Sequence, residues 1–402
     1  MSDDECMLDP YKPAYKIYTM SYGETSNHRT MAEMGVNSAT NAIIVDLRSD
    51  TITKPCLAMR QAMFSAEVGD DVCEEDPTVI NLEKTAANLL GKEASLFVTS
   101  GTMGNLISIM VHCNTRGCEI YVGEDSHIVA HEQGGSSQIA GVILRTFPNN
   151  PDGTFDLNKV KEKIHDPSDA HYAIPKMIAI ENTISGKALP MSWINQVVEF
   201  AKKYNLKLHM DGARLFNAVT KTGLSAIEIT RQFDSVTFCL SKGLGAPVGS
   251  MLCGSKEFIK QARRVRKVLG GGMRQSGVLA AAGLIALENR FKLNKDHEKA
   301  KIIMDTINNT GSSLFKVYSH GQETNMVLIY INNKTKLTAK LFAERLGQVI
   351  DDDNDDKTII KAWSVSPEFV RLVFHLDIND EMLIAAQKKI TYLIKKYDTK
   401  CI

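Results

Sequence analysis

Strand-like segments alternate with helix-like segments between about residues 42 and 290, and this alternation constrains the fold more than any other feature. Such a pattern predicts an α/β fold, in which a mostly parallel sheet is covered by helices on both faces. Ligands of these sheets bind in the loops beyond the carboxyl ends of the strands. The apolar, strand-like segments lie at 96–99, 141–147, 177–180, 206–210 and 236–240.

Helices are expected in three segments between and after these strands. One is the apolar run 106–111. In the second, Ser192 is expected to be the N-cap, and the apolar residues that follow recur at helical spacing as far as Tyr204. In the third, Ser276 is expected to cap an alanine- and leucine-rich buried helix that ends near Glu288.

A chain of 402 residues suits two lobes, or one large domain with a smaller one attached. Residues 1–41 have no sustained period and are expected to form an N-terminal extension. Residues 42–290 are expected to form the large domain. Residues 291–402, with strand-like segments at 326–331 and 369–376, are expected to form a smaller α+β domain.

Charge and cysteine content favour a protein that acts on a small molecule. Lys and Arg number 47, as do Asp and Glu, so no net charge recruits nucleic acid or an anionic membrane. No apolar run is long enough to span a bilayer. The eight cysteines form no CxxC pair, and the acidic N-terminus does not match a targeting leader, which predicts a soluble, cytoplasmic protein with reduced thiols. The acidic segment near Asp351 is expected to be a solvated loop.

The segment SGTMGN at 100–105 is a candidate anion site. Small and hydroxyl residues between a strand and a helix offer N–H groups and the positive end of the helix dipole to an anion. The lysine of a nucleotide P-loop and a GxGxxG motif are both absent, which favours a phosphate on a group other than a nucleotide. A tight turn without any ligand is the alternative.

Asp211 and Lys242 each follow an apolar strand and could carry chemistry. A carboxylate in the position of Asp211 is costly to bury unless it meets a cation, such as a protonated pyridine nitrogen. Arg214, three residues later, could reach the same ligand; an Asp–Arg pair within the loop is the alternative. Lys242, followed by glycines, suits a Schiff-base nucleophile, although most lysines are solvated surface groups.

Two histidines are singled out, and no metal site is expected. The ring of His127 can stack on a flat cofactor, and His171 can act as a general base near neutral pH. His127 and His131 are four residues apart, but the sequence HIVAH lacks the glutamate of HExxH and a third ligand. For each histidine, an ordinary core or surface position is the alternative.

Arginines in unusual surroundings are candidates for substrate binding. Arg48 lies in DLRSDT, Arg274 follows three glycines, and Arg371 lies inside the apolar segment 369–376. An arginine in an apolar strand needs a carboxylate partner, and a bidentate one suits an amino-acid substrate. Structural ion pairs are the alternative for all three.

Taken in order, the motifs of the chain resemble those of the low-specificity L-threonine aldolases, a family of fold-type-I enzymes that use pyridoxal phosphate (PLP). The resemblance runs from about Val45 to about Asp377 and therefore covers most of the chain. Any one segment could arise by chance, whereas the ordered set is specific. The segments are DLRSDT at 46–51, EVGDD at 67–71, SGTMGN at 100–105, ENT at 181–183, DGAR at 211–214, LSKGLG at 240–245, GGGMRQSG at 270–277 and VRLV at 370–373.

The resemblance implies roles for residues that bind PLP. Lys242 would form the Schiff base, Asp211 would pair with the pyridinium nitrogen, and His127 would stack on the ring. Arg214 would lie beside the cofactor. The phosphate would be held by Ser100, Gly101 and Thr102.

Substrate binding and assembly are implied as well. Ser49, Arg214 and Arg371 would hold the substrate carboxylate, and His171 would lie near the substrate hydroxyl. Arg274, with Lys267, would lie near the cofactor across a subunit boundary. The family implies a homotetramer, a dimer of dimers with active sites at the dimer interface.

The implied reaction is retro-aldol cleavage of the Cα–Cβ bond of L-threonine or L-allo-threonine, which yields glycine and acetaldehyde. A β-eliminating lyase, an amino-acid racemase, a hydroxymethyl-transferring enzyme and a non-catalytic PLP-binding scaffold are the alternatives. Residues 1–41 and the segment near Asp351 depart from the family pattern. At His131 some relatives carry an aromatic ring, so the pocket for the β-substituent can differ.

Overall fold

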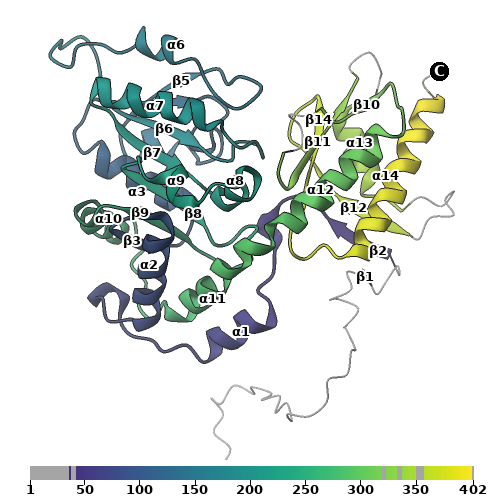
Figure 1. Cartoon of the computed structure of the whole chain (residues 1–402), viewed down its shortest axis with the longest axis horizontal. Helices are drawn as coiled ribbons and strands as arrows, with labels where there is room; N and C mark the ends of the chain where they lie inside the picture. Colours follow the sequence, from purple (N-terminus) through teal and green to yellow (C-terminus); the bar gives the residue numbers. More distant parts are fainter. Residues whose placement is uncertain (1–35, 38–41, 319–322, 333–336, 350–356, 401–402) are drawn as a thin grey trace, which may run out of the picture.

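The computed structural model describes residues 36–37, 42–318, 323–332, 337–349 and 357–400. The described elements form two lobes, and helices α11 and α12 run from one lobe to the other (Figure 1). The acidic segment near Asp351 and most of the expected N-terminal extension lie outside the described residues.

The larger lobe is built around a seven-stranded sheet. Its order is β3-β9-β8-β7-β6-β4-β5, and β9 runs antiparallel to both of its neighbours while the other pairs are parallel. The mostly parallel sheet predicted from the sequence is therefore confirmed. The strands are β3 (Ala94–Val98), β4 (Cys118–Gly123), β5 (Ile143–Phe147), β6 (Ile174–Glu181), β7 (Lys207–Asp211), β8 (Ser235–Cys239) and β9 (Ser250–Gly254).

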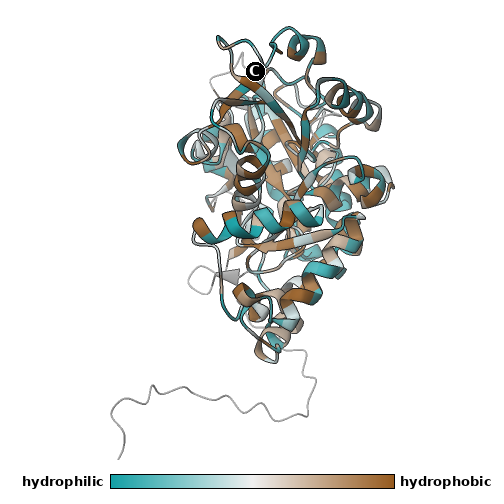
Figure 2. Ribbon diagram, turned by 90° about the vertical axis from the view of Figure 1, so that its left-hand side faces the viewer, coloured by the Kyte–Doolittle hydropathy of each residue, from teal (hydrophilic) through white to brown (hydrophobic). Residues whose placement is uncertain are grey.

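Helices pack against both faces of this sheet. One hydrophobic cluster joins one face to residues of α2, α7, α8, α9 and α11, and another joins the opposite face to α3 and α10. In Figure 2 the helices at the surface are coloured in both teal and brown, so each contains hydrophilic and hydrophobic residues. The helices are α1 (Leu57–Phe64), α2 (Pro77–Leu90), α3 (Gly101–His112), α4 (His127–Ala130), α5 (Gly135–Gln138), α6 (Leu157–Lys161), α7 (Met191–Tyr204), α8 (Leu215–Thr222), α9 (Ala226–Thr230), α10 (Lys256–Val268) and α11 (Gly277–Glu288).

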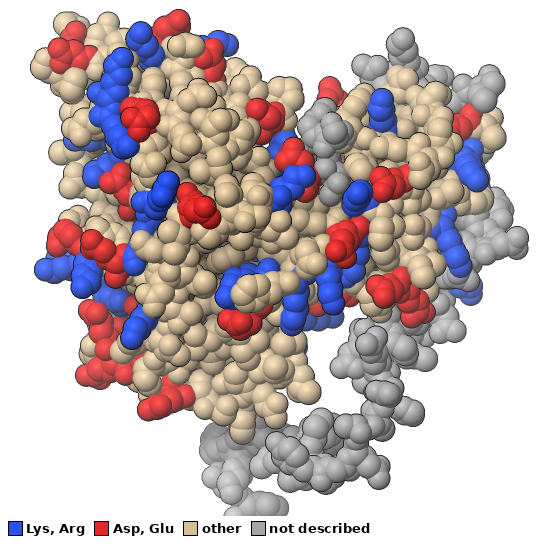
Figure 3. Space-filling view, viewed as in Figure 1, with Lys and Arg blue, Asp and Glu red and all other residues tan. Residues whose placement is uncertain are grey.

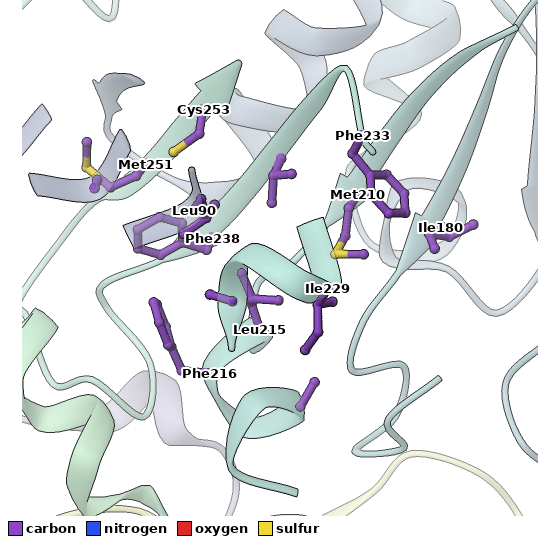
Figure 4. Packing of buried hydrophobic residues seen from close by; sticks show 14 of the residues in the cluster. Leu90, Ile180, Met210, Leu215, Phe216, Ile229, Phe233, Phe238, Met251 and Cys253 are labelled. Carbon is purple, nitrogen blue, oxygen red and sulfur yellow. The ribbon is translucent and has the colours of Figure 1, made fainter. Parts of the chain in front are cut away.

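Strand β7 shows how the sheet separates its two faces. Leu208 and Met210 point into the larger hydrophobic cluster, as strand alternation requires. The side chains of His209 and Asp211 are on the other face, where both contact Asn105 of α3. Figure 4 shows Met210 among the apolar side chains of the larger cluster, close to Ile229 and Phe233.

Of the two predicted helix caps, one is at the predicted position and the other is not. Helix α7 begins at Met191 with Pro190 in the N-cap position, so the prediction of Ser192 was wrong. Proline presets the backbone angle near the start of a helix, and here it begins the helix without a side-chain cap. Ser276 does occupy the N-cap position of α11, but its side chain makes no capping hydrogen bond.

In the described part of the smaller lobe there are two sheets and three helices. Its antiparallel sheet has the order β10-β11-β14-β13, and a three-stranded sheet has the order β1-β2-β12. The elements are β1 (Val36–Asn37), β2 (Ala42–Asp46), β10 (Phe315–Lys316), β11 (Met326–Ile331), β12 (Thr358–Lys361), β13 (Trp363–Ser364), β14 (Phe369–Val373), α12 (Leu293–Asn308), α13 (Ala339–Leu346) and α14 (Asp380–Lys400).

The chain crosses between the lobes more than once. Strand β2 lies within 42–290, the range expected to form the large domain, but it pairs in parallel with β12. Val45 and Leu47 accordingly pack in the hydrophobic cluster of the smaller lobe. The two-domain division stays a prediction, and in this structure β2 is part of the smaller lobe.

A buried ion pair ties the segment after β2 to the larger lobe. Arg214, directly after β7, donates from Nε to Oδ2 of Asp50 at 2.8 Å and from Nη2 to Oδ1. The side chain of Asp50 is fully buried and that of Arg214 is 13% exposed. Nearby, the Thr53 hydroxyl donates to the backbone carbonyl of Lys242 at 3.0 Å. The polypeptide between the lobes is therefore fixed directly against the carboxyl edge of the large sheet.

Replacing Asp50 by Asn should lower the free energy of unfolding by about 3–5 kcal/mol at neutral pH, because Arg214 is left buried without a counter-charge. Burial alone would raise the pKa of Asp50, but the guanidinium of Arg214 holds that pKa at about 2, below its usual 3.8. The charged carboxylate thus stabilises the fold above pH 3.8, and this stabilisation is lost as the pH falls toward 2. Urea unfolding of both proteins at several pH values measures the difference and its decline in acid.

Glu199→Gln is the control, because the Glu199–Lys202 pair on α7 has both side chains more than half exposed. Exposed pairs of this kind contribute little to stability. A loss in Asp50→Asn no larger than that in Glu199→Gln would contradict the inferred role of the buried pair.

Candidate active site

The residues expected to carry the chemistry follow neighbouring parallel strands. His127 follows β4, Glu181 ends β6, Asp211 ends β7 and Lys242 follows β8. These four strands are adjacent, in the order β8-β7-β6-β4. Because the carboxyl ends of parallel strands meet at one edge of a sheet, the four side chains lie at the same edge.

Lys242 is half-buried at the centre of this edge. Its charge is one of the smaller influences on the pKa values of Asp50, which is lowered, and of Glu181 and His127, which are raised, so the amine lies near all three side chains. The backbone carbonyl of Lys242 accepts hydrogen bonds from Thr53 Oγ1 and from the amide of Gly245 at 2.9 Å. The turn that carries the lysine is therefore held in place while its amine remains within the cluster.

Asp211 is a buried carboxylate with defined donors. Its Oδ2 accepts from Asn105 Nδ2 at 2.7 Å, and its Oδ1 accepts from the amide of Ala213 at 3.0 Å. Glu181, paired with Asp211 in the sheet register, lies beside it. The pKa of Glu181 is raised, mainly by burial and to a smaller extent by the charge of Asp211. This edge of the sheet is acidic and would accept a cationic ring nitrogen.

The ring of His127 is oriented by a second buried acid. Its Nδ1 lies 2.9 Å from Oε1 of Glu132, and its backbone amide donates to Oε2 of Glu181 at 2.7 Å. The hydrogen bond to Glu132 is the main cause of a raised pKa for His127. The ring of His131 lies 5.5 Å from that of His127, centroid to centroid. The two rings, both on the loop after β4, form one side of the site.

Ser100, Gly101 and Thr102 begin helix α3 at the end of β3. Ser100 is the N-cap, and its Oγ accepts from the amide of Met103 at 3.1 Å. The first amides of a helix have no acceptor inside the helix, so they remain available to an anion. A Cβ added to Gly101 would lie 3.0 Å from the Cys239 sulfur, so glycine lets this helix end approach β8 closely. The expected phosphate residues therefore lie at the same edge as Lys242.

Arg371 is the least satisfied cation near the site. It lies on β14 of the smaller lobe, and its Nη2 donates only weakly, at 3.4 Å, to the carbonyl of Arg48. Its Nε is buried and has no hydrogen-bond partner among the described residues. The pKa of Arg371 is lowered, mainly by burial and to a smaller extent by the charge of Arg214. Both oxygens of Asp50 bond to Arg214, and among the described residues Arg371 has no carboxylate within ion-pair distance, so Arg371 is available to an anionic ligand.

Ser49 lies beside this pair of arginines. It is buried, its Oγ accepts from the amide of Thr51 at 3.3 Å, and it lies 3.5 Å from Asp50 Oδ1. Arg214, expected to hold a substrate carboxylate, uses Nε and Nη2 on Asp50. Its Nη1 has no hydrogen-bond partner in the described part of the chain. Arg48 is different, because it forms a bidentate pair with Asp46.

The fold separates His171 from these residues within one chain. His171 is exposed, lies just before the start of β6, and its ring bonds only to Asp169 at 2.8 Å. The active-site edge is at the other end of β6, eight residues away along the strand, or roughly 25 Å at 3.3 Å per residue. The structure thus does not bring the expected base together with Lys242.

Arg274 and Lys267 also lie apart from the cluster of their own chain. Arg274 is 57% exposed and its Nη1 donates to Asp70 Oδ2 at 2.8 Å. Lys267 is exposed on α10. Both positions are compatible with a role at a subunit boundary, which stays a prediction.

Sequence reasoning assigned no role to Glu132, Glu181 or Asn105. Glu181 and Asn105 are both in recognised motifs, and Glu181 ends a strand next to Asp211, which is a signal that was available. Asn105 follows four small or apolar residues at the start of a helix, and its buried position was the missing information. Glu132 carries no signal in its local sequence.

His127, Glu132 and Asp211 could in principle share a cation. One ligand atom from each lies within 4.8 Å of the others. The amide nitrogen of Asn105, however, already donates to Glu132 at 2.9 Å and to Asp211. A donor that bridges the two carboxylates favours a hydrogen-bonded network over a metal ion.

Comparisons with known proteins agree with this geometry. The family model described as beta-eliminating lyase matches residues 46–334. The chain is 49% identical over 310 residues to the probable low-specificity L-threonine aldolase 2 of Arabidopsis thaliana, covering 76% of this chain and 87% of the relative. It is 43% identical over 341 residues to the low specificity L-threonine aldolase of Escherichia coli K12, covering 85% and 96%. It is also 36% identical over 258 residues to the alanine racemase TOXG of Cochliobolus carbonum, covering 64% and 68%.

Solved structures show the same fold. A threonine aldolase from Leishmania major has a TM-score of 0.72 with 20% identity, covering 87% of this chain and 99% of the other. A structure described as SPT with PLP has a TM-score of 0.66 with 14% identity, covering 91% and 90%. These likenesses confirm the predicted fold-type-I architecture. From the family match and the identities to its relatives, the chain belongs to the low-specificity L-threonine aldolase family of beta-eliminating lyases.

Proposed function

We propose that this protein is a PLP-dependent aldolase that cleaves L-threonine and L-allo-threonine into glycine and acetaldehyde. One observation carries the proposal: Lys242, Asp211 and His127 meet at one edge of the sheet, beside an arginine that lacks an anion. The family match extends this chemistry to threonine, because the chain covers 87% and 96% of two relatives named low-specificity L-threonine aldolases.

The residues at this edge fit PLP. A helix end with free amides suits the phosphate, the buried carboxylate of Asp211 suits a protonated ring nitrogen, and Lys242 supplies the amine. His127, held by Glu132, can cover a flat ring. When bound, PLP withdraws electrons from the carbon that bears the substrate nitrogen and so makes Cα–Cβ cleavage possible.

The arginines of the site orient the substrate. Arg371, with its unpartnered Nε, binds the substrate carboxylate, and Ser49 and the free Nη1 of Arg214 lie beside it. Asp50 keeps Arg214 in place. Fixing the carboxylate and the amino group of one substrate fixes the direction of its Cα–Cβ bond, which is how orientation contributes to the rate.

A base must also accept the proton of the β-hydroxyl group. His171 stays a prediction for this role, but His131 fits it better within one chain, because it lies beside His127 and close enough to Arg371 to sense its charge. The pKa of His131 is lowered, mainly by burial and to a smaller extent by the charges of His127 and Arg371. The ring is therefore neutral at physiological pH and can accept a proton.

A racemase is the second candidate, favoured by the 36% identity to the alanine racemase TOXG. The residues that bind PLP serve either reaction, so they do not distinguish the two. Release of acetaldehyde from threonine requires cleavage of the Cα–Cβ bond, whereas racemisation leaves that bond intact.

We also propose a homotetramer, a dimer of dimers, located in the cytoplasm. Large apolar side chains are exposed beside the expected subunit boundary, including Val268 at 76% next to Lys267, and Phe64 at 93% on α1. The charges on the face seen in Figure 3 are interspersed, with no large patch of one sign. No described helix combines the length and apolar character needed to cross a membrane. Sedimentation measurements in solution test the assembly.

The unmodified protein with PLP should release acetaldehyde from both threonine diastereomers. Lys242→Ala should abolish this release, because among the described residues no other lysine follows a strand of the large sheet into the site. A coupled aldehyde assay measures the rate, and circular dichroism checks that the variant is folded. Interconversion of alanine enantiomers without any acetaldehyde would instead support the racemase.

His131→Asn should lower kcat by about a hundredfold, since a general base contributes roughly 10²–10⁴ to a rate. His171→Asn is the matched control and should change kcat by less than about twofold, because that ring is exposed and distant from Lys242. PLP occupancy, measured by absorbance, should be unchanged in both variants. A larger loss of kcat in His171→Asn than in His131→Asn would instead assign the role of base to His171.

A further inference from the structure

A chain of buried polar side chains runs from Asp211 into the interior between the sheet and α3. Asn105 Nδ2 donates to Asp211 Oδ2 at 2.7 Å and to Glu132 Oε1 at 2.9 Å. Its Oδ1 lies 3.0 Å from His209 Nε2, and His209 Nδ1 lies 2.8 Å from Ser235 Oγ. All five residues are at most 6% exposed.

The partners of Asn105 fix the orientation of its amide. Two carboxylates can only accept hydrogen bonds, so the NH₂ group must point to Asp211 and Glu132, and Oδ1 must accept from His209. A flipped amide would set its oxygen against both carboxylates and its NH₂ against the N–H of His209. His209 therefore has to carry a proton on Nε2.

The hydrogen bonds of His209, Ser235 and His112 all have their donors on the side away from the active site. Burial lowers the pKa of His209 to about 4, so the ring is neutral and its Nδ1 accepts from the hydroxyl of Ser235. Ser235 Oγ in turn lies 2.8 Å from Nε2 of His112, whose pKa burial lowers to about 3. Each group donates toward the active site, and the series ends on the carboxylate of Asp211.

We propose that Asn105 and His209 are positioning residues that together hold Asp211 and Glu132 in the arrangement that binds the cofactor ring. The inference rests on the proposed role of Asp211. The amide of Asn105 joins Asp211, which would meet the nitrogen of the cofactor ring, to Glu132, which orients His127. The group at the edge of the cofactor ring and the group on its face are therefore held at a fixed position relative to each other. Asn105 also gives each of the two buried carboxylates a hydrogen-bond donor.

Strand alternation explains why β7 can supply both residues. His209 and Asp211 are two positions apart and therefore point to the same face of the sheet, toward α3. Helix α3 comes close enough because Gly104 lacks a side chain; a Cβ there would lie 2.7 Å from Thr237 Cγ2. A purely structural network would fix the same tautomer of His209, so PLP affinity is the measurement that distinguishes positioning of Asp211 from packing alone.

The tautomer of His209 is the first test. Long-range ¹H–¹⁵N spectra of the full-length protein, labelled at histidine and recorded with and without PLP, report the protonated nitrogen of each ring. The His209 signals are identified by their loss in His209→Gln. We expect a neutral ring with its proton on Nε2 at pH 7. A ring protonated on Nδ1, or a charged ring, would overturn the proposal without requiring any variant to remain active.

PLP affinity is the second test, measured by equilibrium dialysis of the folded full-length protein. Asn105→Leu and His209→Leu should weaken PLP binding by about tenfold to a hundredfold, as expected for lost hydrogen bonds to charged groups. His209→Gln, which can still donate to Asn105, should recover most of the affinity. Ser108→Ala is the control, because Ser108 is also buried on α3 but bonds only to the helix backbone at Gly104.

Asp211→Asn separates this inference from the proposed function. If Asp211→Asn leaves PLP affinity unchanged, the role of Asp211 is wrong and the positioning role falls with it. A second outcome is that Asp211→Asn weakens PLP binding while Asn105→Leu weakens it no more than the control Ser108→Ala does. In that case only the positioning role is wrong. Equal losses in His209→Gln and His209→Leu would likewise show that His209 serves packing alone.

Discussion

The buried ion pair between Asp50 and Arg214 is the contact on which the rest of the site depends. It joins the segment that leaves the smaller lobe to the loop at the end of β7. Asn325 of the smaller lobe also donates to Asp50, at 3.4 Å. Because both oxygens of Asp50 bond to Arg214, Asp50 does not pair with Arg371, whose Nε has no hydrogen-bond partner among the described residues. The pair that holds the lobes together therefore also leaves Arg371 without an anionic partner, and a carboxylate ligand would supply one.

The two halves of the site come from different parts of the fold. Residues that fit the cofactor follow parallel strands of the large sheet, where their positions are set by the backbone ladder. Arg371, which fits the substrate, lies on β14 of the smaller lobe. Under the proposed function, a substrate between them would contact both lobes, and its carboxylate would be held by residues other than those that would hold the cofactor.

Sequence patterns predicted the sheet and the residues that follow its strands, because apolar strands and the loops after them are local features. Lys242 and Asp211 were found in this way. Strands β4 and β9 were not predicted. In β4, Glu119 is a fully buried acid that accepts from Tyr121 and Arg145, so a charged residue interrupts the apolar run. The pairing of β2 with β12 was also missed, since a contact between segments more than 300 residues apart leaves no local signal. The remote position of His171 became evident only when the direction of β6 was known.

The groups around Asp211 show why a site is harder to predict than a fold. A buried polar residue is costly unless it finds a partner, and the identity of that partner is decided by packing rather than by neighbouring sequence. Asn105 lies in a recognised motif, but only the approach of α3 to β7 reveals that its amide meets two acids and one imidazole. Once these contacts are known, hydrogen-bond chemistry allows few arrangements: the acids fix the amide, the amide fixes the imidazole, and the imidazole fixes the hydroxyl. Residues without any signal in the sequence thus become the most constrained ones in the folded protein.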